Sequence, residues 1–216
     1  SKKQLTLVFT ADDKADCAYI FLVTLKRNHV QWAFFFTGGF YRDFPDVIKS
    51  LKQDGHYLGA HSNDHLLYCA WENRDSTLIS REVVTKDIVE NYNLMAKAGI
   101  HPADAPLFIP PYEWYNEEIA GWAQGMGLKI VNFTPGTGSN ADYTTPDMKN
   151  YRSSKDIFNQ IIKVEEADGL NGHLLLVHLG THPDRTDKFY NRLDKLIKTL
   201  KKRGYTFVPL RDATGY

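Results

Sequence analysis

The chain has 216 residues, of which 43% are hydrophobic, 13% aromatic and 24% charged. This composition excludes a disordered tail and a disulfide-stapled miniprotein, and the length suits a single domain over residues 1–216. The 26 Lys and Arg residues balance the 26 Asp and Glu residues. The chain therefore has no net charge to attract phosphate backbones, and we expect no nucleic-acid partner.

Targeting and redox signals are weak. The longest strongly apolar run, residues 19–25, is far shorter than the roughly 20 residues of a membrane-spanning helix, so we expect no membrane span. No basic and apolar leader is present, and we expect any signal peptide to lie outside this chain. Cys17 and Cys69 show no CxxC spacing, which favours buried or unpaired thiols over a disulfide or a catalytic thiol. We expect a monomer.

Short β-rich runs alternate with longer runs of helical period, which is typical of βα units around a mostly parallel sheet. The predicted strands are residues 5–10, 31–36, 57–60, 107–109, 128–132, 173–179 and 206–210. The predicted helices are residues 16–27, 43–53, 78–98, 116–124, 154–166 and 186–203. These units are too few for an eightfold barrel of about 250 residues. The predicted fold is α/β, an irregular TIM-barrel-like (β/α) barrel of about seven parallel strands.

Polar residues follow several of these strands, and the carboxyl ends of parallel strands are where α/β proteins place their functional groups. We expect one shared mouth to hold the following residues: Asp12, Asp13, His61, His65, Tyr112 and His178.

His61 and His65 are four residues apart, so one helical turn would bring both imidazoles to a single metal ion. The alternative is two surface histidines in a loop. The carboxylates and the histidine at neighbouring strand ends favour the metal.

A purely structural role is the alternative to a functional one for Asp12, Asp13 and His178. The two carboxylates can cap the following helix, or one can bind a metal while the other acts as a base. His178 can be a core histidine bonded to a carbonyl group, or a general acid at the end of its strand.

Four short motifs occur in order along the chain: Thr10–Asp13, His61–His65, Phe108–Tyr112 and Leu174–His178. Together they resemble the polysaccharide deacetylases of carbohydrate esterase family 4, the NodB homology domain. The second motif matches the family pattern H-S/T-x-x-H completely, whereas Ala11 replaces the aromatic residue of the first motif, T-F-D-D.

The resemblance implies an irregular barrel that hydrolyses acetyl groups from a polysaccharide or oligosaccharide. It also implies one divalent metal ion, Zn, with Co, Ni or Mn as alternatives. Asp13, His61 and His65 would be its ligands.

The remaining roles follow from the same resemblance. Asp12 would be the base that takes a proton from the attacking water, and His178 the acid that protonates the leaving group. The backbone N–H of Tyr112 would donate to the oxyanion.

Two positions depart from the family pattern. The arginine of the third motif, which holds the catalytic carboxylate, is Ile109, and a neutral Asn132 stands where the family usually has an aspartate behind the acid histidine. Both changes would remove a charged side chain that stabilises the charged form of a catalytic residue. Glu113 or Asp142 could supply the carboxylate and Lys14 the cation.

Aromatic residues in the loops suggest a sugar platform. Trp114 and Tyr115, which closely follow Pro111 and Tyr112, are the first candidates, and Pro111 is included among the expected substrate-binding residues. Trp71 is a further candidate and Tyr143 lies in a similar loop, with ordinary loop packing as the alternative for each ring.

The leading hypothesis is a metal-dependent carbohydrate deacetylase acting on N- or O-linked acetyl groups. The runner-up is a carbohydrate-binding module descended from such an enzyme, motivated by Ile109 and Asn132. A third hypothesis is another metal-dependent barrel hydrolase. A polymeric substrate favours an exported protein.

Overall fold

Seven parallel strands form one curved sheet in the computed structural model, which describes residues 2–215. Six follow the spatial order β5-β4-β3-β2-β1-β6, and β7 pairs with the start of β1. The Thr134 N–H, just beyond β5, donates to the Leu174 carbonyl of β6 at 3.0 Å, so the two edges of this half-barrel meet at one point. The strands are β1 (Gln4–Ala11), β2 (Ala33–Phe36), β3 (Tyr57–Ala60), β4 (Leu107–Phe108), β5 (Lys129–Ile130), β6 (His173–His178) and β7 (Thr206–Phe207).

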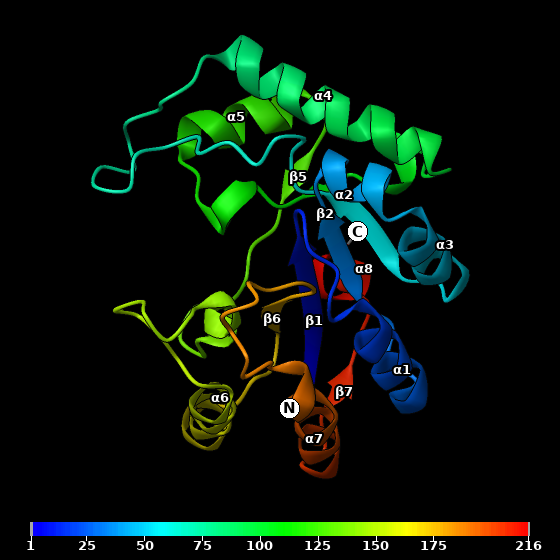
Figure 1. The fold of residues 1–216 in the computed structure, drawn as a ribbon, viewed down its shortest axis with the longest axis vertical. Coiled ribbons are helices and arrows are strands. Elements are labelled where there is room, and N and C mark those ends of the chain that lie inside the picture. The colour runs from blue at the N-terminus through cyan, green and yellow to red at the C-terminus, as the bar shows by residue number, and fades with distance from the viewer. Residues whose placement is uncertain (1, 216) are drawn as a thin grey trace.

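Most helices surround the sheet on its outer side (Figure 1), whereas the C-terminal helix contributes Leu210 to the interior of the sheet. The helices are α1 (Ala18–Asn28), α2 (Gly38–Asp43), α3 (Pro45–Gln53), α4 (Arg81–Lys97), α5 (Glu117–Gly125), α6 (Ser154–Asp168), α7 (Tyr190–Lys202) and α8 (Leu210–Thr214). The described residues also include three 3₁₀ turns: η1 (Pro102–Asp104), η2 (Pro111–Glu113) and η3 (Ser139–Tyr143). Within residues 2–215, no helix combines the length and apolar character needed to cross a bilayer. Cys17 and Cys69 are buried and unpaired, as expected.

The predicted fold class is confirmed, and β3 has the predicted bounds. Two short helices differ from the prediction. A Cβ atom at Gly38 would lie 1.9 Å from Asn63 Oδ1, so this glycine lets α2, which was not among the predicted helices, pack against the segment after β3. Residues 206–210 were predicted as one strand, but β7 ends at Phe207 and α8 begins directly after Pro209.

The strands have two apolar faces, as expected for a parallel sheet covered on both sides. Outward side chains of β1, such as Phe9, pack under the helices, whereas Val8 joins a small interior cluster with Phe35 and Ile109. A Cβ atom at Gly59 would lie 2.7 Å from the Phe35 ring, so Gly59 faces this interior. Because side chains alternate along a strand, His61 lies on the same side, directly above the interior cluster.

Candidate active site

A cleft of about 760 Å³ lies at the carboxyl ends of the strands. It is bordered by the ends of β1, β3 and β6 and by the turn after β4, so the topology brings together segments that are distant in sequence. Its walls include Asp12, Asp13, Lys14, His61, His65, Trp71, Tyr112, Glu113, Tyr143 and His178.

The imidazoles of His61 and His65 face each other, with their Nε2 atoms 3.3 Å apart. His61 is only 2% exposed, and its Nδ1 atom lies 2.8 Å from the Ile109 carbonyl oxygen. Since a carbonyl only accepts, Nδ1 carries the proton, and Nε2 of the neutral ring keeps its lone pair. The loop adopts positive φ at Ser62 and His65, which turns both rings to the same side.

Two buried polar residues of α4 hold this loop. The Asp87 carboxylate accepts from the backbone N–H groups of Asn63 and Asp64 at 3.1 and 2.8 Å. Asn91 Oδ1 accepts from the His61 N–H at 3.0 Å. Sequence reasoning missed both residues. Their spacing in the sequence could have identified them, because it places them on the same helix face as the buried apolar residues of α4.

Burial lowers the pKa of His61 well below its ordinary range, and the neighbouring His65 lowers it further. The pKa of His65 is also lowered by burial, partly opposed by the Asp12 carboxylate. Both rings are therefore neutral near pH 7, which is the form that binds metals.

The spacing of the two histidines fits a tetrahedral metal ion. Two nitrogens that are each about 2.1 Å from such an ion are about 3.4 Å apart, close to the observed 3.3 Å. The tethered Nδ1 of His61 is the outer support that metal-binding imidazoles usually have. A complete set of three His, Cys, Asp or Glu ligands is not assembled among residues 2–215.

The two aspartates after β1 point to solvent. Asp13 is 72% exposed in its side chain, and its Oδ1 lies 2.7 Å from Lys14 Nζ. Asp12 is exposed as well, and the structure of residues 2–215 contains no hydrogen bond or ion pair to its carboxylate. The position of the family arginine is filled by Ile109, whose side chain is buried in the apolar interior. Lys14 therefore pairs with Asp13, and no Lys or Arg side chain of residues 2–215 forms an ion pair with Asp12.

His178 is paired with Asp142 of η3. Its Nδ1 lies 2.6 Å from Asp142 Oδ1, and its backbone N–H donates to Oδ2 at 2.8 Å. Burial would lower the pKa of His178, but the charge and hydrogen bond of Asp142 outweigh it, and the pKa is raised. The aspartate missing from the fourth motif is thus replaced by Asp142. Asn132, assigned to that place from sequence, instead donates from Nδ2 to the Glu113 carbonyl at 2.9 Å.

Arg185 is a fully buried guanidinium that sequence reasoning missed. Its Nη1 donates to the carbonyl oxygens of Thr144 and Arg152 at 2.6 and 2.9 Å, and its Nη2 donates to Ser154 Oγ at 3.1 Å. These bonds tie the chain after η3 to the start of α6, and so fix the segment that carries Asp142.

Glu113 lies between the two histidine groups. Its Oε1 is 3.6 Å from His61 Nε2. Burial raises the pKa of Glu113, partly opposed by the positive charge of His178. The turn η2 also buries Pro111 and directs Tyr112 to the cleft. Glu113 and Asp142 were the two candidates predicted from sequence to replace the carboxylate missing from the fourth motif. Asp142 supports His178, whereas Glu113 faces His61.

The aromatic residues divide into an exposed and a packed group. Trp71 is 53% exposed and meets the Tyr112 ring edge-on, with centroids 5.4 Å apart. Trp114 and Tyr115 are half-buried, and the Arg74 guanidinium lies 4.8 and 5.3 Å from their ring centroids. Trp71 and Tyr112 line the cleft, whereas the Trp114–Tyr115 pair lies behind them as packing.

The profile of the polysaccharide deacetylase family matches residues 1–131. The chain belongs to this family. The profile covers the first three motifs, and His178 lies beyond the matched residues.

Individual relatives extend the match along the chain. A peptidoglycan-N-acetylmuramic acid deacetylase of Bacillus subtilis is 24% identical over 212 residues, which is 97% of this chain and 72% of that protein. A peptidoglycan-N-acetylglucosamine deacetylase of Listeria monocytogenes is 24% identical over 216 residues. This match covers the whole chain but only 40% of the Listeria protein.

Solved structures share the fold. The Bc1960 peptidoglycan N-acetylglucosamine deacetylase superposes with a TM-score of 0.78 at 23% identity, covering 99% of this chain and 88% of that one. A Bacillus anthracis CE4 family pseudoenzyme, BA3943, superposes with a TM-score of 0.74 at 17% identity, covering 99% and 66%. The same fold therefore occurs in an enzyme and in a pseudoenzyme, so the fold does not establish activity.

Proposed function

We propose that this family member is a metal-dependent hydrolase that removes acetyl groups from a polysaccharide or oligosaccharide. The observation that carries the proposal is the presence, in one cleft, of a matched imidazole pair and a carboxylate-supported histidine. The Nε2 atoms of His61 and His65 are 3.3 Å apart, and His178 is 2.6 Å from Asp142. The first pair suits a metal and the second a general acid.

His61 and His65 would hold the ion, with Asp13 as the carboxylate ligand that the family pattern implies. The ion is Zn in our proposal, with Co, Ni or Mn as alternatives, because imidazole suits first-row divalent metals. When bound there, a divalent ion would polarise the acetyl carbonyl and lower the pKa of water, which would allow hydrolysis near neutral pH.

The proton transfers are assigned to Asp12 and His178. Asp12 takes the proton of the attacking water, and His178 donates one to the leaving nitrogen or oxygen. Asp142 holds the His178 ring in place and favours its charged form. The backbone N–H of Tyr112 donates to the oxyanion, an interaction of about 3 kcal/mol in comparable sites.

The substrate would be a sugar polymer held against Trp71 and Tyr112. Flat rings stack on the apolar faces of pyranose rings, and a chain without net charge suits a substrate that is bound by stacking and hydrogen bonds. The named relatives act on peptidoglycan, which lies outside the cytoplasm. We therefore include peptidoglycan among the candidate substrates and propose that the protein is exported and monomeric.

Acetate release tests this proposal. Chitin oligosaccharides, peptidoglycan and acetylated xylan are each incubated with enzyme, with chelated enzyme, and with chelated enzyme to which metal has been restored. We expect at least one substrate to release acetate, chelation to stop it, and Asp12→Asn to reduce it to background. The hypothesis fails if metal binds stoichiometrically but no substrate exceeds the Asp12→Asn background.

The second candidate is a carbohydrate-binding module with the enzyme fold. It is favoured by the exposed carboxylate of Asp12, which has no ion-pair partner among residues 2–215, and by the buried Ile109 at the position of the family arginine, since a base without a cation is poorly positioned. Saturable binding of the same oligosaccharides without acetate release would support this candidate.

A further inference from the structure

Glu113 is a buried carboxylate that no family motif assigns. It directly follows the Pro-Pro-Tyr segment, its side chain is only 11% exposed, and its Oε1 lies 3.6 Å from His61 Nε2. This nitrogen is the one that His61 leaves free, because Nδ1 is bonded to the Ile109 carbonyl. The carboxylate therefore faces the imidazole atom that is available to a metal.

The backbone around Glu113 is strained and firmly held. Tyr112 and Glu113 have φ values of 60° and 55°, a region that non-glycine residues rarely adopt. The Glu113 N–H donates to the Pro110 carbonyl at 3.0 Å, and its carbonyl accepts from Asn132 Nδ2 at 2.9 Å. Strain of this kind persists only where the surroundings enforce it, and it gathers at functional sites. The conformation of this turn therefore fixes the direction in which the Glu113 carboxylate points.

Asp13 offers the contrast. Its carboxylate is mostly exposed and bonded to Lys14. Among residues 2–215, Glu113 is the one carboxylate with an oxygen within 4.0 Å of a ring nitrogen of His61 or His65. No Lys or Arg side chain within these residues pairs with Glu113. The positive charge of His178 offsets part of the cost of burying Glu113, and a cation beside His61 would offset more of it.

We propose that Glu113 is a ligand of the divalent metal ion held by His61 and His65. The inference rests on the metal dependence proposed above. Two neutral imidazoles leave the double charge of the ion uncompensated, and a carboxylate oxygen is a common third ligand beside two histidines in zinc sites. Glu113 would take the third-ligand place that the family pattern gives to Asp13, whose carboxylate pairs with Lys14. Asn132 then acts as a positioning residue, because it holds the backbone of the turn that presents Glu113.

Metal affinity tests the role of Glu113 without relying on activity. Zn²⁺ affinity is measured by competition with a chromophoric chelator, and coordination by the visible absorption of the Co²⁺ form. Wild type is compared with Glu113→Gln, which removes the charge at nearly constant shape, and with Glu113→Asp, which shortens the side chain. Glu117→Gln is the matched control, since Glu117 is exposed on the first turn of α5.

We expect Glu113→Gln to weaken Zn²⁺ binding by about tenfold or more and to change the Co²⁺ spectrum, with Glu113→Asp intermediate and Glu117→Gln unchanged. Without metal, Glu113→Gln should melt at or above the wild-type temperature, while its gain in Tm on adding Zn²⁺ shrinks. A purely structural role would instead lower the melting temperature without metal.

Two results would overturn the inference, and they are distinguishable. If Glu113→Gln keeps the wild-type affinity and spectrum, Glu113 is not a ligand although the metal site stands. If wild type itself binds neither Zn²⁺ nor Co²⁺, the metal dependence of the proposed function fails together with the inference.

Discussion

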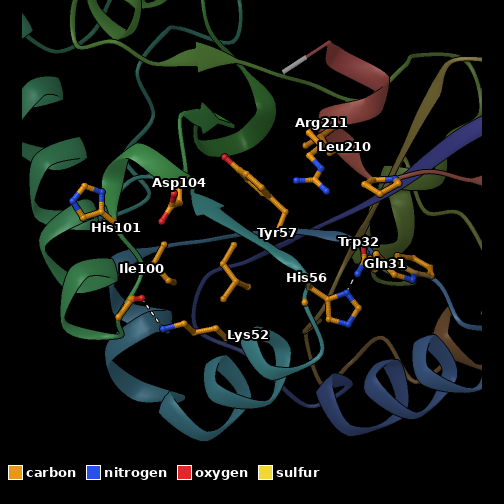
Figure 2. A pocket seen from close by; sticks show the side chains of 14 residues that line it. Gln31, Trp32, Lys52, His56, Tyr57, Ile100, His101, Asp104, Leu210 and Arg211 are labelled. Atoms are coloured by element: carbon orange, nitrogen blue, oxygen red, sulfur yellow. Dashed lines mark hydrogen bonds between the residues drawn. The ribbon is translucent and has the colours of Figure 1, made fainter.

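A cavity lies at each end of the sheet. These two cavities are lined by similar types of side chain, but the side chains form different hydrogen bonds. The carboxyl-end cleft, of about 760 Å³, contains histidines, aspartates and a lysine. A cavity of about 330 Å³ at the amino ends of β2 and β3 contains His56, His101, Asp104 and Lys52 (Figure 2). Residue type alone would not distinguish them.

Hydrogen bonds distinguish the two. At the amino end, Lys52 Nζ donates to the Gly99 carbonyl at 2.6 Å, and His56 Nδ1 accepts from the Trp32 N–H at 3.1 Å (Figure 2). The hydrogen bonds of these side chains hold neighbouring backbone segments together. At the carboxyl end, the Nε2 atoms of His61 and His65 face each other. A candidate site is therefore recognised by the ligand atoms that the fold leaves available.

The largest expected effect is that of His61→Ala. It removes one of the two matched nitrogens, so stoichiometric metal binding should be lost and acetate release should fall to the level of chelated enzyme. Isothermal titration with Zn²⁺ and the acetate assay measure both effects. Metal binding at wild-type affinity would show that the imidazole pair is not the metal site.

Asp142→Asn should come next, with kcat reduced by about 10²- to 10⁴-fold, the range of general acid catalysis. Asp142 raises the pKa of His178, so its loss leaves burial as the main influence, and burial lowers that pKa. If protonated His178 is the acid, the alkaline limb of the kcat profile moves to lower pH. An unchanged limb would remove His178 from the role of acid.

The same pair affects stability in a defined direction. The pKa of His178 is raised above its ordinary value of 6.5 in the folded protein, so the pair contributes its full stabilisation below that pH. This contribution is lost as the pH rises through the folded-state pKa. Urea unfolding of wild type and Asp142→Asn should therefore show a difference that shrinks between mildly acidic and alkaline pH.

Trp71→Ala should have a smaller effect that is confined to substrate binding. One stacked ring contributes about 1 kcal/mol, so we expect KM to rise about fivefold with kcat nearly constant. Trp114→Ala, which removes a packed ring, should mainly lower stability. Steady-state kinetics on a chitin oligosaccharide distinguish the two, and equal KM changes would contradict the division into exposed and packed rings.

His56→Ala at the opposite end should leave metal binding and kcat unchanged. It removes the acceptor of the buried Trp32 N–H, which should cost about 1–3 kcal/mol of unfolding free energy. Denaturant unfolding measures the loss. A large change in kcat would show that the two cavities are coupled.

Much of the fold was predictable from the sequence because its signals are local. The bounds of β3 were predicted directly, and the apolar run that forms β6 was recognised as a strand. Helix α2 was missed because Gly38 is needed for a close approach to Asn63, which is a contact across the fold. Helix α8 was missed because an apolar stretch of five residues fits a strand as well as a helix end.

The sequence by itself determined the family, the order of βα units and the set of residues at one mouth, because periodicity and strand-end position are properties of short segments. Only the tertiary structure decided which side chain each carboxylate contacts. Asp142 and His178 are 36 positions apart, and Asn132 holds Glu113 across 19. Such pairings depend on how long loops fold back over the sheet. Loop conformation is set by packing and by buried hydrogen bonds such as those of Arg185, which no local pattern encodes.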